Sequence, residues 1–174
     1  DTLVIITSDH GEHLGEHELF GHQFSLHDEL VRVPMIVRYP VAFVAGSQRD
    51  DPVSLVDILP TVLGAAGSPI PGDLDGIDLL EGATPADRLI RAEYARPRTL
   101  VNQVWQPAHP DIDLSRFDAA LSSARRGRWK LIRREDGAES LFDLVSDPGE
   151  NTPLDPLSAG PALPGLRSAL DPRR

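Results

Sequence analysis

The sequence contains no cysteine, which excludes disulfides, thiolate metal sites and a cysteine nucleophile within these 174 residues. Aromatic residues are also scarce, at 5%, so a core must be built from Leu, Ile, Val and Ala within the 40% of hydrophobic residues. No stretch reaches the roughly 18 consecutive apolar residues of a membrane-spanning helix. We therefore expect no membrane span in this chain.

Basic residues are in the minority, with 17 Lys and Arg against 27 Asp and Glu and a formal net charge of -10. Because a nucleic-acid-binding surface needs a basic stripe, we expect no nucleic-acid partner. No signal peptide is visible, and a cytoplasmic location is favoured. The sequence opens without Met and inside an apolar run, so we expect residue 1 to lie within a longer protein. The oligomeric state is left open.

The first half of the sequence has the pattern of an α/β protein. Residues 3–7 (LVIIT) and 33–40 (VPMIVRYP) are continuous β-branched runs, typical of parallel strands that are buried on both faces. Between them, residues 8–21 are polar and rich in glycine, which predicts a loop at the carboxyl end of the first strand. Apolar residues recur at helical spacing in VSLVDILPTVLGAAG, with Asp57 as a candidate N-cap and Gly67 as the expected stop.

The second half has the pattern of an antiparallel meander. The last two of its predicted strands are separated by EDG, which indicates a hairpin. A short helix is expected over residues 162–170, and residues 96–115 have no clear period. The predicted strands span residues 88–95, 119–126, 128–134 and 139–144.

These patterns predict two regions, residues 1–87 and residues 88–174. The first would be the C-terminal part of an α/β/α sandwich with a mostly parallel central sheet. The second would be a small antiparallel sheet with an irregular tail. Since two parallel strands are not stable alone, we expect further strands of the central sheet before residue 1.

Asp9 and His10 follow the first predicted strand directly. A rigid strand end aims two successive side chains at one point, and a carboxylate oxygen with an imidazole nitrogen suits a divalent cation. The alternative is that Asp9 caps a turn and His10 is an ordinary polar residue of the loop. The pair alone leaves these two interpretations open.

Four further histidines lie close to this pair in the sequence. His13 and His17 are four apart, as in zinc-binding helices, but the intervening glutamate is Glu16 rather than the residue after the first histidine. Gly11 and Gly15 also disfavour a helix, so a solvated loop is the preferred interpretation. His22 is either a structural histidine or a group that faces a substrate. His27 is expected at the surface.

The segment TSDHGEHLGEHELFGHQFSLHDELVRVPMIVRYP resembles the sulfatases of the alkaline-phosphatase-like superfamily. Three later segments agree with that family in the same order: VSLVDILPTVLGAAG, DGIDLL and RWKLIR with ESLFDLVSDPGE. The resemblance covers most of residues 1–155 and leaves out the stretch 96–118. The ordered series is specific, because several motifs rarely coincide in sequence by chance.

The resemblance implies that Asp9 and His10 are metal ligands and that the metal is a divalent cation, usually calcium. The imidazole of His10 keeps manganese and zinc open. Family members often carry a lysine that meets the sulfate where this sequence has His22, so His22 is the candidate catalytic residue. A histidine is a weaker and more pH-dependent anion ligand than a lysine. The implied substrate is a small sulfate ester or a sulfated glycan.

The family's nucleophile is a formylglycine made from Cys or Ser in C/S-x-P-x-R, and this motif is absent from these residues. The resemblance therefore implies the C-terminal fragment of a sulfatase, inactive by itself. Two alternatives stay open: a phosphodiesterase or phosphonate monoester hydrolase of the same superfamily, and a non-catalytic binding member. A Cys or Ser in the family motif upstream would favour a sulfatase, whereas a Thr or an unmodified Ser would favour phosphoryl transfer.

Overall fold

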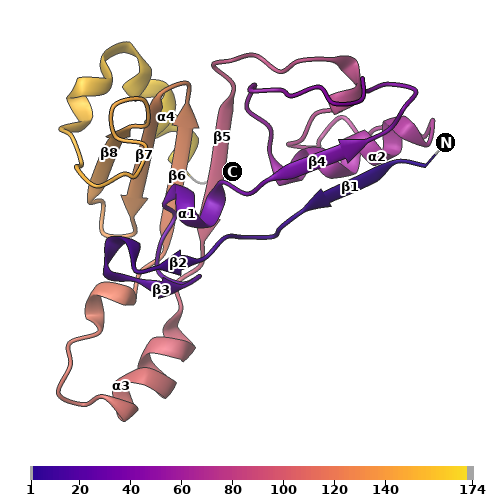
Figure 1. Cartoon of the computed structure of the whole chain (residues 1–174). Coiled ribbons are helices and arrows are strands. Elements are labelled where there is room, and N and C mark those ends of the chain that lie inside the picture. The colour runs from indigo at the N-terminus through magenta and orange to yellow at the C-terminus, as the bar shows by residue number, and fades with distance from the viewer. Residues whose placement is uncertain (1, 172–174) are drawn as a thin grey trace. The chain divides into compact units, whose positions relative to one another are not determined.

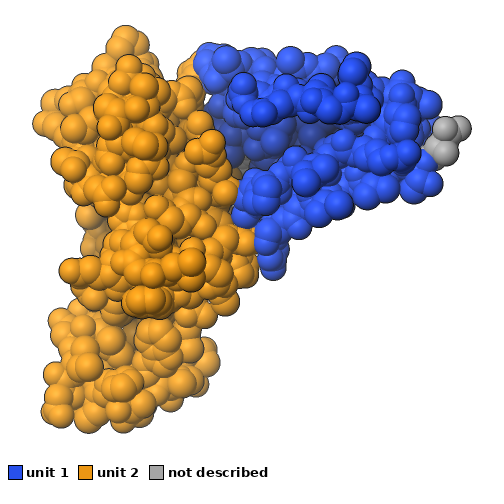
Figure 2. Space-filling model, in the orientation of Figure 1, with its two compact units in different colours: residues 1–9, 33–90 blue, residues 10–32, 91–174 orange. Residues whose placement is uncertain are grey.

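The structure is a computed structural model that describes residues 2–171, and the chain divides into two compact units. The first comprises the residues up to Asp9 together with Val33–Ile90, and the second comprises His10–Arg32 together with the residues from Arg91 onward (Figure 2). The sequence predicts one boundary near residue 87. The structure instead groups the segment that follows Asp9 with the C-terminal sheet.

In the first unit, strand β1 (Val4–Thr7) pairs with strand β4 (Met35–Arg38), as Figure 1 shows. The pairing is antiparallel, with Thr7 opposite Met35, so the expected parallel pairing of these two runs is wrong. After the segment that follows β1, the chain re-enters the sheet beside the C-terminal end of β1, so β4 runs antiparallel to it. A parallel partner would need a crossover connection back to the N-terminal end of β1. An apolar run specifies a strand but leaves its direction open.

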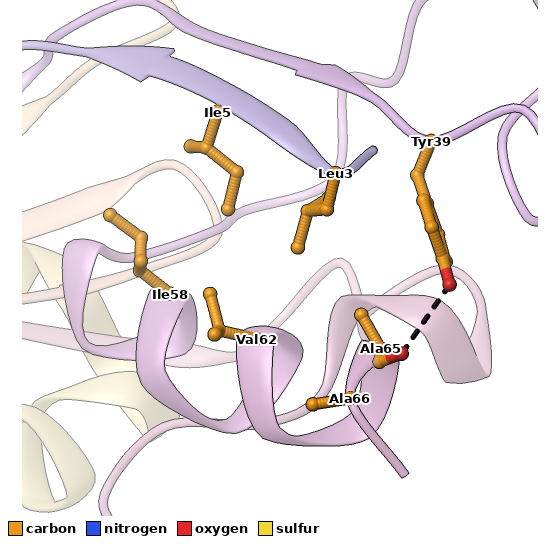
Figure 3. A pocket seen from close by; sticks show the side chains of 7 residues that line it. All are labelled: Leu3, Ile5, Tyr39, Ile58, Val62, Ala65 and Ala66. Atoms are coloured by element: carbon orange, nitrogen blue, oxygen red, sulfur yellow. Dashed lines mark hydrogen bonds between the residues drawn. The ribbon is translucent and has the colours of Figure 1, made fainter. Parts of the chain in front are cut away.

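One face of this strand pair packs on helix α2 (Ile58–Ala65). Leu3 and Ile5 point towards Ile58 and Val62 across a shallow pocket, which Tyr39 also lines (Figure 3). On the strands, Val4, Ile6 and Ile36 are 38%, 59% and 61% exposed. The prediction that these runs are buried on both faces therefore does not hold within residues 2–171. The α/β class itself is confirmed.

Helix α2 starts and ends close to where the sequence predicts. A 3-10 turn, Leu55–Asp57, precedes it, and Ser54 and Asp57 form a reciprocal capping box there. Gly67 has a φ of +65°, the left-handed conformation expected after a helix. The turn at Leu79–Glu81 completes the regular structure of this unit.

Asp57 also organises the turn that precedes α2. Its side chain is fully buried, accepts two hydrogen bonds from the Arg88 guanidinium at 2.6 Å each, and accepts others from the backbone N–H groups of Ser54 and Ile77. Burial alone would raise the pKa of Asp57, but Arg88 and the two N–H groups outweigh it and hold the pKa below its ordinary value.

Asp57→Asn is expected to lower the free energy of unfolding of this unit by roughly 2–3 kcal/mol, because it leaves the Arg88 charge unpaired where it is only 12% exposed. The contribution of a carboxylate with a depressed pKa is present above about pH 4 and lost as the pH falls through the folded value. Hydrogen exchange of the α2 amides measures the effect. Asp73→Asn, at an exposed position, is the control. An equal loss in both variants would contradict this account.

The second unit is built on a four-stranded sheet of order β5-β6-β7-β8. Strands β6, β7 and β8 pair antiparallel, as predicted, and helix α4 (Leu163–Leu170) packs over them. The core between sheet and helix is aliphatic, formed by Ala124, Leu131, Leu141, Leu163, Leu166 and Leu170. The strands are β5 (Leu89–Tyr94), β6 (Leu121–Arg126), β7 (Trp129–Arg134) and β8 (Glu139–Asp143).

The remaining elements of this unit are short. Residues 96–115, which have no clear period in the sequence, contain a π-helical turn that runs into helix α3. Trp105 from that turn packs against Phe24, with a distance of 5.0 Å between the ring centroids. Such brief turns lack the repeated spacing that a sequence pattern needs. Within residues 2–171, no helix is both long and apolar enough to cross a bilayer. These elements are β2 (His13–Leu14), β3 (Phe20–Gly21), α1 (Asp28–Val31), Leu100–Trp105, α3 (Gln106–Ala108) and the 3-10 turns Glu16–Glu18, Ser115–Phe117 and Pro156–Ala162.

Candidate functional site

The polar segment after β1 forms a small hairpin rather than the predicted loop. Strands β2 and β3 pair antiparallel with His13 opposite Gly21, and the turn Glu16–Glu18 forms the tip. This register places Glu12 and His22 side by side at the open end of the hairpin. The His22 Nδ1 lies 2.8 Å from the Glu12 Oε1, at hydrogen-bond distance.

Gly11 fixes the backbone beside His10. Its N–H donates to the carbonyl of Leu30 in helix α1 at 2.8 Å. A Cβ at this position would stand 1.9 Å from the carbonyl oxygen of Glu29, so only glycine permits the approach. The entry to the hairpin is therefore held against α1 by backbone contacts.

The structure presents the predicted metal ligands Asp9 and His10 on consecutive residues after β1. The His10 Nδ1 lies 2.9 Å from the carbonyl oxygen of Gly11, and since a carbonyl only accepts, this nitrogen carries the proton. In the neutral ring the Nε2 is then the unprotonated nitrogen, the tautomer that a metal ligand requires. Asp9 Oδ1 contacts the Ser8 hydroxyl at 3.4 Å. Carboxylate oxygens and imidazole nitrogens are both ligand types that divalent cations accept.

The structure also brings His22 to His10. Their rings stack with centroids 4.2 Å apart and an angle of 25° between planes. The side chain of His22 is 44% exposed, so it meets solvent while Glu12 holds its Nδ1. The sequence motif suggests the importance of His22, whereas the role of Glu12 depends on the hairpin register, which the motif does not reveal.

Of the three other histidines between His10 and Arg32, His13 is buried and His17 and His27 are mostly covered, with side chains 14% and 19% exposed, contrary to the prediction of a solvated loop and a surface His27. His13 is 0% exposed, and burial lowers the pKa of its imidazole. The rings of His17 and His27 stack with centroids 3.7 Å apart and nearly parallel planes. His17 Nε2 lies 3.4 Å from a carboxylate oxygen of Glu29, which is also in α1. The centroid of the His13 ring lies 5.6 Å from that of His17 and 6.4 Å from that of His27, so the three imidazoles form one cluster.

A buried ion-pair network fastens α1 to the sheet. Lys130 of β7 is 2% exposed, and its Nζ lies 2.6 Å from Asp28 and 2.9 Å from Glu150. Burial would raise the pKa of Glu150, but His27, Lys130 and the backbone N–H of Asp28 hold it below its ordinary value. Lys130 and Glu150 lie in the predicted RWKLIR and DPGE segments, yet the sequence gives no sign that they pair.

Comparison with known proteins agrees with the motifs. A model of the sulfatase family matches residues 1–68. Arylsulfatase K of Bos taurus is 35% identical over 178 residues, covering 98% of this chain and 29% of that protein. The N-acetylglucosamine-6-O-sulfatase of Bacteroides thetaiotaomicron is 42% identical over 99 residues, covering 54% of this chain and 18% of that protein. The chain thus spans less than a third of the length of these relatives.

Two solved structures are similar over nearly the whole chain. One, in complex with its substrate D-glucosamine-2-N,6-O-disulfate, has a TM-score of 0.74 at 28% identity and covers 97% of this chain and 33% of the other. The second, a phosphonate monoester hydrolase of Agrobacterium radiobacter, has a TM-score of 0.66 at 28% identity over the same shares. This chain is therefore similar in fold both to a protein with a disulfated glucosamine as substrate and to a phosphonate monoester hydrolase.

Proposed function

Since this chain belongs to the sulfatase family of the alkaline-phosphatase-like superfamily, we propose that it forms part of the active site of a metal-dependent sulfuric ester hydrolase. The observation that carries the proposal is the grouping at the end of β1. His10 has its Nδ1 engaged by a backbone carbonyl, and His22 stacks on its ring. Asp9 directly precedes His10 and adds a carboxylate to the donor set, whose other ligands are proposed to come from outside these 174 residues.

Asp9 and His10 would hold the divalent cation. Calcium is the expected ion, although the imidazole of His10 also suits manganese or zinc. When bound, such a cation neutralises the anionic oxygens of the ester and orients the nucleophile. The Gly11 carbonyl keeps the His10 ring in the ligating tautomer, and the contact of Gly11 with α1 keeps that carbonyl in place.

His22 would contact the sulfate group or the leaving oxygen. Glu12 accepts the hydrogen bond from Nδ1 and so fixes the ring, and the imidazolium form then has an Nε2–H to donate to the sulfate. Glu12 is then a positioning residue that acts through His22. A preorganised donor of this kind stabilises charge that develops during the reaction.

The nucleophile is proposed to come from chain outside these 174 residues, since they contain neither a cysteine nor the motif C/S-x-P-x-R. The exposed apolar side chains of Val4, Ile6 and Ile36 support this arrangement, because a contiguous apolar strand face is typically covered by further structure. Under this proposal the chain alone is inactive, and activity is measured on the intact protein.

The proposed substrate class is a sulfated sugar. Support comes from the similarity to an N-acetylglucosamine-6-O-sulfatase and to a structure that holds a disulfated glucosamine. A second candidate is phosphonate monoester hydrolysis, which the equally identical hydrolase of Agrobacterium radiobacter favours. Testing sulfate and phosphonate esters on one preparation separates the two.

His22→Ala is expected to lower kcat of the intact protein on an aryl sulfate by roughly a hundredfold, the usual cost of one preorganised donor. Calcium content should stay unchanged, because His22 is not proposed to bind that ion. His22→Lys should restore part of kcat, because the lysine supplies a cation that can contact the sulfate. His109→Ala, at an exposed position, is the control. If His22→Ala loses its calcium, His22 ligates the ion and the assignment is wrong.

A further inference from the structure

The open end of the hairpin carries three potential metal ligands that the proposed calcium site does not use together. One ligand atom from each of His10, Glu12 and His22 lies within 4.8 Å of the others. Glu12 Oε1 is 2.8 Å from the Nδ1 of His22, which would have to give up its proton to ligate an ion. His10, whose Nδ1 lies against the Gly11 carbonyl, would ligate through Nε2. In a tetrahedral site with bonds of about 2.1 Å, ligand atoms stand roughly 3.4 Å apart, so Glu12 and His22 would need to separate by only about 0.6 Å.

From this geometry we propose a transition-metal site, of the zinc class, formed by His10, Glu12 and His22. Two imidazoles and one carboxylate are a known zinc ligand set, which leaves a fourth position for water. Calcium, in contrast, takes six to eight oxygen ligands, so a group with two nitrogen ligands and one carboxylate suits it poorly. The site differs from the proposed calcium site because it uses Glu12 and does not need Asp9.

The fold holds the three ligands close before any ion arrives. Glu12 and His22 flank the first residue pair of β2 and β3, and the stacked rings place His10 beside His22. Glu12 and His22 have side chains 49% and 44% exposed, which gives an ion a direct path from solvent. The simpler interpretation is that Glu12 only accepts a hydrogen bond from His22, and the test below separates the two.

Binding at this site would have a regulatory consequence, which rests on the proposed function. A zinc-class ion held by His10 and His22 would occupy a ligand of the calcium ion and the residue that meets the sulfate. The protein would therefore be inhibited by zinc even when calcium is present. Glu12 would set the sensitivity, since it would ligate the zinc-class ion but not the calcium ion, although it also positions His22.

The binding test uses Co²⁺ as a spectroscopic probe and Zn²⁺ in calorimetry, on the intact protein in calcium-containing buffer without substrate. We expect one Co²⁺ per chain, with the visible absorption of a four- or five-coordinate ion. Glu12→Gln should weaken Co²⁺ and Zn²⁺ binding by roughly a hundredfold, as expected when a metal ligand is lost. Glu18→Gln, at an exposed position in the same hairpin, should bind as the parent does.

Equal affinity in Glu12→Gln and the parent would overturn the proposal, because binding would then be adventitious. The second readout is the zinc concentration that halves hydrolysis of an aryl sulfate, expected to rise at least about tenfold in Glu12→Gln. Metal binding that depends on Glu12 in a protein without sulfatase activity would uphold the site and refute the proposed function. Sulfatase activity together with metal binding that does not depend on Glu12 would uphold the proposed function and refute the zinc site.

Discussion

Asp9→Asn is expected to lower kcat/KM of the intact protein on an aryl sulfate by several orders of magnitude and to weaken binding of the divalent cation. The amide keeps the size of the side chain but removes the negative charge that balances the cation. Since a bound cation stabilises the transition state by several kcal/mol and each 1.36 kcal/mol is a factor of about ten in rate, the loss is large. Steady-state kinetics with elemental analysis of bound metal measures both effects.

The control for this variant is Asp50→Asn, which removes the same charge from an exposed position in the same unit. It should leave rate and metal content as in the parent. Unchanged activity in Asp9→Asn would refute the metal assignment of this residue. Lost activity with full metal content would instead make Asp9 a residue that acts on the substrate or nucleophile.

Lys130→Met is expected to destabilise the second unit by about 3–5 kcal/mol, the cost of leaving buried charges without their partner. The Nζ of Lys130 is the cation that faces both Asp28 and Glu150, and Glu150 is 2% exposed. Both tryptophans, Trp105 and Trp129, lie in this unit, so urea unfolding followed by tryptophan fluorescence reports on it directly.

The pH dependence of this variant tests the same network. The pKa of Glu150 is depressed in the folded protein, so its stabilising contribution is present above about pH 4.3 and is lost as the pH falls through the folded value. The difference in stability between Lys130→Met and the parent should therefore shrink in acid. In a double-mutant cycle, adding Glu150→Gln should recover part of the loss. A difference that is independent of pH would contradict the ion-pair explanation.

This network connects stability to the site. Asp28 pairs with Lys130, and both Asp28 and Leu30 belong to the short helix α1. The Leu30 carbonyl receives the N–H of Gly11, next to His10. A loosened α1 would release the entry of the hairpin, so substitutions at Lys130 are expected to reduce activity as well as stability.

The sequence predicts those features of the fold that repeat locally. Strands β7 and β8 follow from their apolar runs and the EDG turn, and α2 follows from its helical spacing and its stop at Gly67. The direction of β4 relative to β1 does not follow, because a continuous apolar run suits either pairing. That direction depends on where the chain re-enters the sheet after the segment between β1 and β4.

In the candidate site, too, the sequence predicts local features but not contacts between distant residues. Asp9 and His10 are located by the end of a strand, which a local pattern reveals. The covering of His27 depends on partners far along the chain, such as Glu150, whose carboxylate lies 3.6 Å from the His27 Nδ1. The hairpin itself has only two residue pairs, too few to produce an alternating pattern. A histidine in a polar, glycine-rich stretch therefore has the sequence pattern of a surface residue even where the fold buries it.

The central claim, that this chain serves a metal-dependent sulfuric ester hydrolase, is tested most directly by kcat/KM on an aryl sulfate and on an aryl phosphonate monoester. Both are measured on one preparation of the intact protein, before and after chelation of divalent cations. The account predicts a higher kcat/KM for the sulfate ester, lost on chelation and restored by calcium. Hydrolysis of the phosphonate ester without turnover of the sulfate ester, or sulfate hydrolysis that survives chelation, would contradict it.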